Sequence, residues 1–442
     1  MKRAVKKEEK LYRIGMIIGG IVLFVMVLYF SLHLDTNEAP DEQMRMMVVK
    51  FIYEHHRLPL GSEAEIRHKV WGFSYGYTPY LPCLLGAFNM RIVSLFTTSE
   101  TALWNAARFE NVCAILMMWF LVGKIGCRVM KNRSSALLLA VMVCFLPQIV
   151  FIASYLNNDM ISLMCTSWIA LGWLRGDQDG WNAKNAVSLG IGIGILALTY
   201  YNDYAWILCS IFFFFASAAK QKLEGKKILQ YALIVFFTAF AIAGWFFIRN
   251  YIIHDGDFLG MNTMYAQGEK YAQDPYRPTK RATPLHQGLS FYDTFIASDW
   301  FGLSWKSFIA VFGYMNIMMK QWFYVLYTVM YVVLIGLTVM EMIRRKDVPA
   351  RWNVCLLICM AVPVVLSMYY SYSIDYQAQG RYIISMALPL MFFCTYGTDS
   401  IVFRIKKKGV RAGSVLNLFL TVFWLVLSFY SLFSAFVPNS MI

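Results

Sequence analysis

Long apolar runs separated by short polar segments dominate the pattern of this 442-residue chain. Runs of about 20 residues can cross a hydrocarbon core of about 30 Å, and backbone in lipid must satisfy its own hydrogen bonds, which favours helices. The chain is therefore predicted to be an all-α, polytopic membrane protein with one transmembrane domain over residues 1–442. We expect eleven spans, near residues 14–34, 108–127, 134–153, 159–175, 186–201, 204–219, 228–249, 322–343, 354–372, 382–403 and 414–436.

Two polar segments are long, residues 35–107 and 250–321, and both fall on the same side of the predicted membrane. Within the first, Glu42–His56 has apolar residues at helical spacing. The segment Tyr80–Phe96 is apolar with Arg91 inside it, and we expect a helix that lies on the membrane surface or dips into it. The alternative is a complete span that buries Arg91. It would invert every later segment and break the charge pattern.

Composition and charge support the membrane assignment and suggest an orientation. Hydrophobic residues make up 59% of the chain and charged residues 15%, against about 25% charged residues in soluble proteins. The formal net charge is +14. Well over half of the 40 Lys and Arg residues fall in alternate short segments, near residues 1–13, 124–133, 175–184, 220–227, 344–351 and 404–411.

Basic loops of membrane proteins face the cytoplasm. The N-terminus is therefore predicted to be cytoplasmic, whereas the C-terminus and both long segments are predicted to be external. Nucleic acid is excluded as a partner, because the basic residues are spread over six membrane-flanking segments and do not gather on one face.

Side chains that can carry chemistry gather on the predicted external side, including all six histidines and most acids. Asp41-Glu42 follows the first span, where adjacent carboxylates could supply a general base or bind a metal. The alternative is a solvated turn in which Asp41 caps a helix that starts at Glu42. Asn157-Asn158-Asp159 forms another external turn. By itself it suits a turn and a helix cap, and it becomes a functional candidate if it faces Asp41.

Three arginines lie at external membrane boundaries, against the usual charge distribution. Arg108 opens the second span, Arg249 ends the seventh beside Asn250, and Arg381 opens the tenth. Their side chains could extend to lipid headgroups, or they could bind a lipid phosphate, which guanidinium groups match bidentately. The residues alone leave both interpretations open.

Two other patterns favour structural roles. Gly190, Gly192 and Gly194 resemble part of a dinucleotide fingerprint, but they lie inside an apolar span without a preceding strand, so close helix packing is the expected role. His55-His56 with His68 matches no compact zinc motif. Metal binding is therefore left unknown.

Several short motifs, taken in order, resemble the C superfamily of glycosyltransferases (GT-C), and within it an incompletely characterised bacterial group. They cover nearly the whole chain. The motifs are Ala39-Pro40-Asp41-Glu42, Arg108, Asn157-Asn158-Asp159, Trp245–Tyr251, Ser307-Phe308 with Phe312-Gly313, and Gln379-Gly380-Arg381-Tyr382.

The resemblance implies a GT-C-like fold in a bacterial plasma membrane, with an active site beneath the first long external segment. Similar enzymes take sugars from dolichyl or undecaprenyl phosphate. The resemblance implies that Asp41 is the base, with Glu42 as its neighbour and Asp159 as a second acid. In some relatives the equivalent acids bind a metal. The expected donor-phosphate residues are Arg249, Arg381 and Arg108, and the expected substrate-binding residues are Asn157, Asn158, Asn250, Gln379 and Tyr382.

Two departures from the family pattern affect these expectations. Gln43-Met44-Arg45 follows Asp41-Glu42, where relatives commonly have a small residue and a histidine. Tyr200-Tyr201-Asn202-Asp203 lacks a lysine that many relatives use for the donor phosphate. The expected phosphate contacts therefore shift to Arg249 and Arg381.

We expect the transfer of a sugar from a polyprenyl-phosphate carrier to a hydroxyl of a glycan, lipid or protein acceptor, by one inverting displacement. Membrane lipids are the other expected partners, and a divalent metal is the only cofactor considered. A transporter or flippase of lipid-linked saccharides is the alternative. It is less favoured because the acids lie at membrane exits, whereas coupling ions bind near mid-span. A non-catalytic assembly subunit with the same fold is a third hypothesis.

Overall fold

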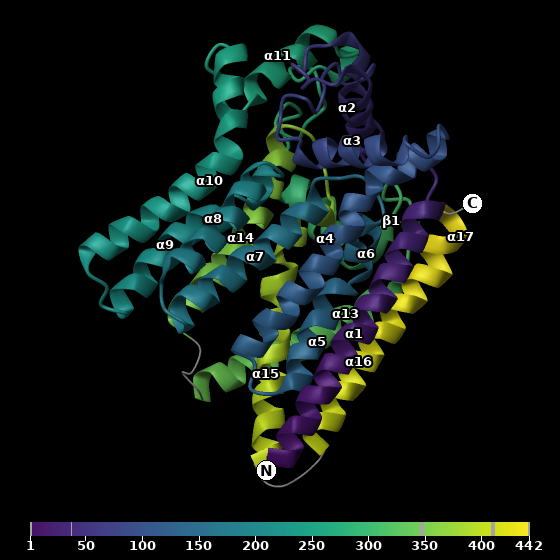
Figure 1. Cartoon of the computed structure of the whole chain (residues 1–442). Helices are drawn as coiled ribbons and strands as arrows, with labels where there is room; N and C mark the ends of the chain where they lie inside the picture. The colour runs from purple at the N-terminus through teal and green to yellow at the C-terminus, as the bar shows by residue number, and fades with distance from the viewer. Residues whose placement is uncertain (1, 37, 345–348, 408–411, 441–442) are drawn as a thin grey trace.

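The protein is a bundle of long helices capped at one end by shorter ones (Figure 1). The computed structural model describes residues 2–36, 38–344, 349–407 and 412–440. Parts of the basic segments 344–351 and 404–411 and of the chain ends therefore lie outside the described residues. The first described residues lie at the bottom end of the bundle in Figure 1, and the last ones lie towards the opposite end.

Eight helical segments among the described residues are long and apolar enough to cross a membrane. They belong to α1 (Lys2–His33), α4 (Glu100–Val129), η2 with α9 (Tyr201–Asp203 and Ala205–Lys220), α10 (Gly225–Ile253), α13 (Gln321–Arg344), α14 (Ala350–Ser373), η5 with α15 (Gly380–Met386 and Ala387–Lys407), and α16 with η6 and α17 (Ala412–Ser431, Leu432–Phe436 and Val437–Ser440). A ninth is present if α5 (Arg133–Cys144) and α6 (Pro147–Ala153), bent by 60°, count as one span.

The predicted number of eleven spans is not confirmed, although a helix forms at every predicted position. The two remaining helices are α7 (Asp159–Gln178) and α8 (Ala183–Ala197). α7 carries charged residues in its first and last turns and is buried along almost its whole length, so packing against protein replaces contact with lipid. α8 has 15 residues, or about 22 Å, which is shorter than the hydrocarbon core.

The first long polar segment, residues 35–107, is partly helical, as predicted. α2 (Glu42–His55) begins at the predicted residue. α3 (Leu81–Val93) has 13 residues, or about 20 Å, which is too short for a span. Within α3, Phe88 is 63% exposed and Ile92 44% exposed, and the helix lies across the top of the bundle (Figure 1). An exposed apolar face in this position is typical of an interfacial helix.

The remaining elements lie mostly in the second long polar segment, residues 250–321. They are α11 (Met261–Tyr271), η3 (Asp274–Tyr276), η4 (Tyr292–Ala297), α12 (Trp300–Ala310), β1 (Val311–Phe312) and β2 (Ile317–Met318), with η1 (Ala64–Ile66) in the first segment. β1 and β2 form a short antiparallel hairpin. The two long polar segments contact each other, since the amide of Gln273 donates to the carbonyl of Val70 at 3.0 Å. Arg67 also covers the ring of Tyr271 at 3.7 Å.

Small residues bring α8 and α10 into close contact, as predicted for the glycines of α8. A Cβ atom on Gly190 would lie 2.7 Å from Thr238, and one on Gly194 would lie 2.9 Å from Ile242. In lipid, where apolar surface provides little driving force between helices, such close approach is a main source of attraction. The glycines are therefore packing residues.

One buried ion pair joins four segments at the upper end of the bundle. Arg108 of α4 forms two 2.7 Å bonds to the carboxylate of Glu42 in α2, and both side chains are 0% exposed. The same guanidinium donates to the carbonyls of Ser31 and Leu34 at the end of α1, at 2.9 and 2.7 Å. The amide of Leu156 donates to Glu42 at 2.9 Å, which adds the turn before α7.

A close backbone contact positions the start of η5. A Cβ atom on Gly380 would lie 1.9 Å from the amide nitrogen of Phe308 in α12. Only glycine fits this approach, which brings the Gln379–Tyr382 motif against the Ser307-Phe308 motif. The side chain of Arg381, the next residue, is thereby directed from a fixed backbone.

We predict that Glu42→Ala strongly destabilises the protein. The substitution leaves the Arg108 guanidinium buried without its carboxylate, and breaking a buried pair in this way costs about 3–5 kcal/mol. The thermal unfolding midpoint of the purified protein in detergent measures the loss. Glu38→Ala, at a half-buried acid in the same segment, is the matched control. Equal midpoints for the two variants would contradict the prediction.

We also predict that Gly380→Ala displaces the start of η5, because the added methyl group overlaps the backbone of Phe308. Overpacking of this kind costs about 1–3 kcal/mol or more. Gly336→Ala is the control, since a Cβ atom there meets nothing within 4 Å. Thermal unfolding and limited proteolysis compare the variants, and an unchanged Gly380→Ala protein would show that the contact is not tight.

Candidate functional site

The structure brings together two residues that lie 340 positions apart, Asp41 and Arg381. Asp41 precedes α2 with a left-handed backbone (φ 62°). Nη2 of Arg381 donates to Oδ2 of Asp41 and, at 3.3 Å, to the hydroxyl of Tyr382. Arg381 is 8% exposed, whereas the Asp41 side chain is 26% exposed.

A second arginine and a second acid lie beside this pair. Nη1 of Arg45, in α2, donates to Oδ1 of Asn158 at 2.7 Å. Its guanidinium covers the ring of Tyr75 at 4.3 Å. Asp159 opens α7 and is 4% exposed, and both Arg45 and Arg381 attract its carboxylate. The centre therefore consists of the carboxylates of Asp41 and Asp159 together with the guanidinium groups of Arg45 and Arg381.

The two guanidinium groups keep Asp41 ionised. Partial burial raises the pKa of the Asp41 carboxyl, but Arg381 and Arg45 together outweigh this effect, and the pKa falls below its ordinary value. Burial raises the pKa of the Tyr75 phenol well above its usual range, and the Asp41 carboxylate raises it further. Near neutral pH, a carboxylate at Asp41 thus faces a neutral Tyr75 hydroxyl, which also lowers the pKa of Asp41.

Three polar atoms of the centre are buried without a hydrogen-bond partner among the described residues. They are Nε of Arg45, Nε of Arg381 and Oδ1 of Asp159. Buried polar atoms almost always have a partner, and an unpaired one costs about 1–3 kcal/mol. The clustering of three such atoms around one ion pair gives the centre hydrogen-bonding capacity for a polar ligand.

These side chains do not suit a divalent metal. Among the described residues, no group of three or more His, Cys, Asp or Glu side chains is arranged to hold a metal ion. Asp41 is paired with Arg381, and two guanidinium groups next to the acids oppose a second cation. Phosphate, which guanidinium groups bind well, is the better match.

Two expected site residues have another role in the structure. Arg108 was expected to bind donor phosphate and Glu42 to take part in catalysis. Each instead satisfies the other, and both are fully buried. Sequence alone showed an arginine at a membrane boundary, but it could not show that the anion opposite was a carboxylate of this chain. Both residues are positioning groups.

Three expected substrate-binding amides are occupied by backbone. Nδ2 of Asn157 donates to the carbonyl of Ile152 at 2.6 Å, and its Oδ1 accepts from the amide of Met160. Nδ2 of Asn158 donates to the carbonyl of Thr199 at 2.7 Å, while its Oδ1 holds Arg45. The turn-and-cap interpretation therefore describes Asn157, whose side chain accepts from an amide in the first turn of α7. The Asn158 side chain makes no cap bond and instead orients Arg45.

Asn250, the third of these amides, and its neighbour Arg249 lie apart from the Asp41 centre. Nδ2 of Asn250 donates to the carbonyl of Tyr77 at 3.0 Å, and Nη2 of Arg249 donates to the carbonyl of Pro59 at 2.8 Å. These two hydrogen bonds join α10 to the first long polar segment at Pro59 and Tyr77, and neither of them involves Asp41. Gln379 bonds to Gln377.

Arg45 and Tyr75 are members of the centre that sequence reasoning did not assign. Arg45 follows Asp41 by four positions at the start of a helix, a spacing that places side chains on one face. That signal was present in the sequence. Tyr75 lies in an irregular part of the first external segment, and only the fold brings it to Asp41.

Three solved structures resemble the chain in fold, all at 12% sequence identity. The archaeal oligosaccharyltransferase AglB from Archaeoglobus fulgidus, in complex with an inhibitory peptide and a dolichol-phosphate, has a TM-score of 0.55 over 92% of this chain and 55% of its own. ArnT from Cupriavidus metallidurans, bound to undecaprenyl phosphate, has a TM-score of 0.53 over 95% and 70%. The mycobacterial arabinofuranosyltransferase AftD has a TM-score of 0.54 over 96% and 27%.

These neighbours are GT-C glycosyltransferases, so the expected GT-C-like, polytopic helical fold is confirmed. The chain spans about half the length of the oligosaccharyltransferase, and at this identity the likeness concerns the fold. Comparison with curated protein sequences finds no match. The sequence profile of a family described as "Predicted membrane protein (DUF2142)" matches residues 12–390. Since this match covers most of the chain, the protein belongs to the DUF2142 family of membrane proteins.

Proposed function

We propose that the protein transfers a sugar from a polyprenyl-phosphate carrier to an acceptor hydroxyl, with inversion at the anomeric carbon. The observation that carries the proposal is the Asp41–Arg381 ion pair, with Arg45 and Asp159 beside it. It combines a carboxylate that can accept a proton with cations that can hold a leaving phosphate. The shared fold supports the reaction class, and the AglB and ArnT structures contain a dolichol-phosphate and an undecaprenyl phosphate.

The geometry suggests an order of events. In the described state Arg381 bonds to Asp41, so an arriving donor phosphate competes with Asp41 for the same guanidinium. Once the phosphate holds Arg381, the Asp41 carboxylate is free to face the acceptor. The acceptor oxygen attacks the anomeric carbon and its proton passes to Asp41. The bond from that carbon to the phosphate oxygen breaks, and its electron pair leaves with the phosphate.

The charges generated in this step match the side chains present. Proton transfer to a positioned carboxylate contributes about 10²–10⁴-fold to a rate. Stabilisation of the leaving phosphate by preorganised cations usually contributes at least as much. Asp159 lies close to both arginines and, in this proposal, keeps them oriented when the phosphate departs.

We place this centre on the external face of the plasma membrane, with the N-terminus in the cytoplasm. Basic segments meet at the lower end of the bundle, where Arg133 at the start of α5 pairs with Glu9 of α1 at 2.8 Å. There Asp399 of α15 accepts the amide of Asn132 at 3.0 Å. Asp41 directly precedes α2, and α2 and α3 lie at the other end of the bundle (Figure 1). The positive-inside tendency then makes the lower end cytoplasmic.

We predict that Asp41→Asn lowers sugar transfer by about 10²–10⁴-fold, because an amide cannot accept the proton. The assay uses membranes supplied with radiolabelled hexoses and pentoses on undecaprenyl phosphate. Asp299→Asn is the matched control, since Asp299 also has a left-handed backbone (φ 56°) and precedes a helix. Undiminished transfer by a folded Asp41→Asn protein would remove Asp41 as the base. Counterflow of intact lipid-linked sugar would instead indicate a transporter.

Arg381→Gln should weaken donor binding and shift the pH dependence. Loss of a charged hydrogen bond costs about 1.5–3 kcal/mol, or roughly 10–100-fold in the KM for the donor. Arg381 lowers the pKa of Asp41, so its removal raises that pKa. Asp41 then becomes protonated at a higher pH, and the acidic limb of the kcat/KM profile moves upward.

Arg249→Gln is the control for this variant, because it removes an equivalent charge at another external helix end. It should leave the acidic limb in place, since Arg249 contacts Pro59 and not Asp41. If Arg249→Gln instead raises the KM for the donor as strongly as Arg381→Gln does, the phosphate lies nearer to α10 than proposed.

A further inference from the structure

The segment that precedes Arg381 carries three polar side chains in a row. Residues 375–379 connect α14 to η5 without regular structure, and Gln379 has an extended backbone (φ −120°, ψ 128°). In an extended chain, alternate side chains lie on the same face. Nε2 of Gln377 donates to Oδ2 of Asp375 at 2.7 Å, and Nε2 of Gln379 donates to Oε1 of Gln377. These three side chains therefore share one face, and we call them the polar row.

The alternate side chains of the same segment are held against protein. Ala378 is 8% exposed and lies in an apolar cluster with Phe295 and Trp300. The hydroxyl of Tyr376 donates to Oγ of Ser298 at 2.8 Å. The side chains of the polar row point away from these contacts and are each partly exposed. The segment is thus fixed on one face and open to a ligand on the other.

The polar row leads directly to the Asp41 centre. It ends two positions before Arg381 in the sequence, and the Arg381 guanidinium bonds to Asp41 and to the hydroxyl of Tyr382. The Tyr382 ring lies 5.9 Å from the ring of Tyr370. The carbonyl of Tyr370 accepts the amide at the start of the row at 3.1 Å. Chain continuity and hydrogen bonds therefore join the row and two tyrosine rings to the groups that we assign to the reaction.

The far end of the row lies near an arginine and an indole ring. The amide of Leu285 donates to the carbonyl of Tyr372 at 3.1 Å, which fixes the second long polar segment beside the end of α14. In that segment, Arg281 covers the ring of Trp71 at 5.0 Å. Burial raises the pKa of the Asp375 carboxyl, and the charge of Arg281 partly offsets this effect. The row thus extends from this arginine to the Asp41 centre.

The chemistry of the row suits the hydroxyl groups of sugars. A hydroxyl both donates and accepts hydrogen bonds, a carboxylate accepts them, and a carboxamide does both. The row is at most about 14 Å long, which exceeds the length of one sugar ring. The tyrosine and tryptophan rings beside it offer flat apolar surface, on which the C–H faces of sugar rings pack.

The backbone of the row is not free to bind a peptide. An extended peptide that adds to a protein pairs with its main chain. The amide of Gln377 donates to Oγ of Ser371 at 3.3 Å, and the carbonyl of Gln377 accepts from the same hydroxyl at 3.0 Å. The carbonyl of Gln379 accepts the amide of Tyr382 at 3.3 Å. The side chains of the row, and not its backbone, are therefore the groups that face a ligand.

We infer that the acceptor is a saccharide, whose sugar rings bind along Asp375, Gln377 and Gln379 so that one hydroxyl reaches Asp41. The inference rests on the proposed function and names the acceptor class for it. Gln379 belongs to a motif already expected to bind substrate. Asp375 and Gln377 are added to it by the structure, and they give the site its preference for hydroxyl groups.

Binding to immobilised probes tests the inference. An array of oligosaccharides and serine-containing tripeptides is incubated with the full chain in phosphatidylcholine nanodiscs, without a sugar donor. The protein should bind saccharides and no tripeptide. Asp375→Asn should weaken saccharide binding by about 10–100-fold, as expected for the loss of a charged hydrogen bond. Gln377→Ala should weaken it by about 3–10-fold, as expected for a neutral one.

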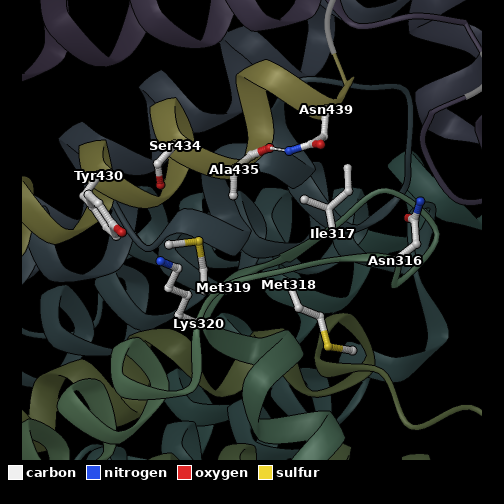
Figure 2. Close-up of a pocket in the computed structure, with 9 residues that line it drawn as sticks. All are labelled: Asn316, Ile317, Met318, Met319, Lys320, Tyr430, Ser434, Ala435 and Asn439. Carbon is white, nitrogen blue, oxygen red and sulfur yellow. Dashed lines mark hydrogen bonds between the residues drawn. The ribbon is translucent and has the colours of Figure 1, made fainter.

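Asn439→Ala is the control variant. Asn439 is an exposed amide in a groove of about 460 Å³ between the β1–β2 hairpin and the C-terminal helices (Figure 2). The described residues that line this groove include none of the polar row. The substitution should therefore leave every saccharide affinity unchanged.

Binding of tripeptides in place of saccharides would overturn the inference, and so would the absence of any bound saccharide. Unchanged affinity in both Asp375→Asn and Gln377→Ala, or an equal loss in Asn439→Ala, would remove the saccharide from the row. Binding is measured without sugar transfer, so these outcomes remain informative if the transferase proposal fails. Conversely, a protein that loses transfer in Asp41→Asn but keeps it undiminished in Asp375→Asn and Gln377→Ala would reject the row alone.

Discussion

A single buried guanidinium determines where four segments of the chain meet. The Arg108 side chain satisfies the last carbonyls of α1, the carboxylate of Glu42 and, through that carboxylate, the turn before α7. A buried ion pair contributes little net stability, because desolvation offsets its attraction. Its contribution here is geometric. With Glu42 held on one side, its neighbour Asp41 takes a left-handed backbone and faces Arg381 on the other side.

The Asp41 centre depends on contacts that hold the backbone around it in place. Asn158 bonds to two carbonyls and to Arg45, and Gly380 fixes the backbone beside Arg381. Nε of Arg45, Nε of Arg381 and Oδ1 of Asp159 have no hydrogen-bond partner among the described residues. The buried polar atoms of Glu42, Arg108 and Asn158, which position the centre, have partners.

The pattern of apolar residues predicted those helices whose formation depends on residues close together in the sequence. Long apolar runs identified α1, α4 and α10 because crossing lipid requires such runs, and helical spacing identified α2. The predicted number of eleven spans is not confirmed, because α7 is buried along almost its whole length and α8 has only 15 residues. The role of Arg108 could not be predicted. An arginine at a membrane boundary has the same appearance whether its partner is a phosphate or a glutamate 66 residues away. The place of Arg45 beside Asp41 could have been predicted from the spacing of the two residues. The place of Tyr75 could not, because only the fold brings it to Asp41.

The length of α10 links the first long polar segment to the membrane itself. The helix has 29 residues, or about 44 Å, and exceeds a hydrocarbon core of about 30 Å. It must therefore tilt or protrude, and the extent of either depends on bilayer thickness. Asn250, near its end, is bonded to the carbonyl of Tyr77 in the first external segment, which also carries Tyr75. A change in bilayer thickness that tilts or shifts α10 is therefore transmitted through Asn250 to the chain around Tyr77 and Tyr75.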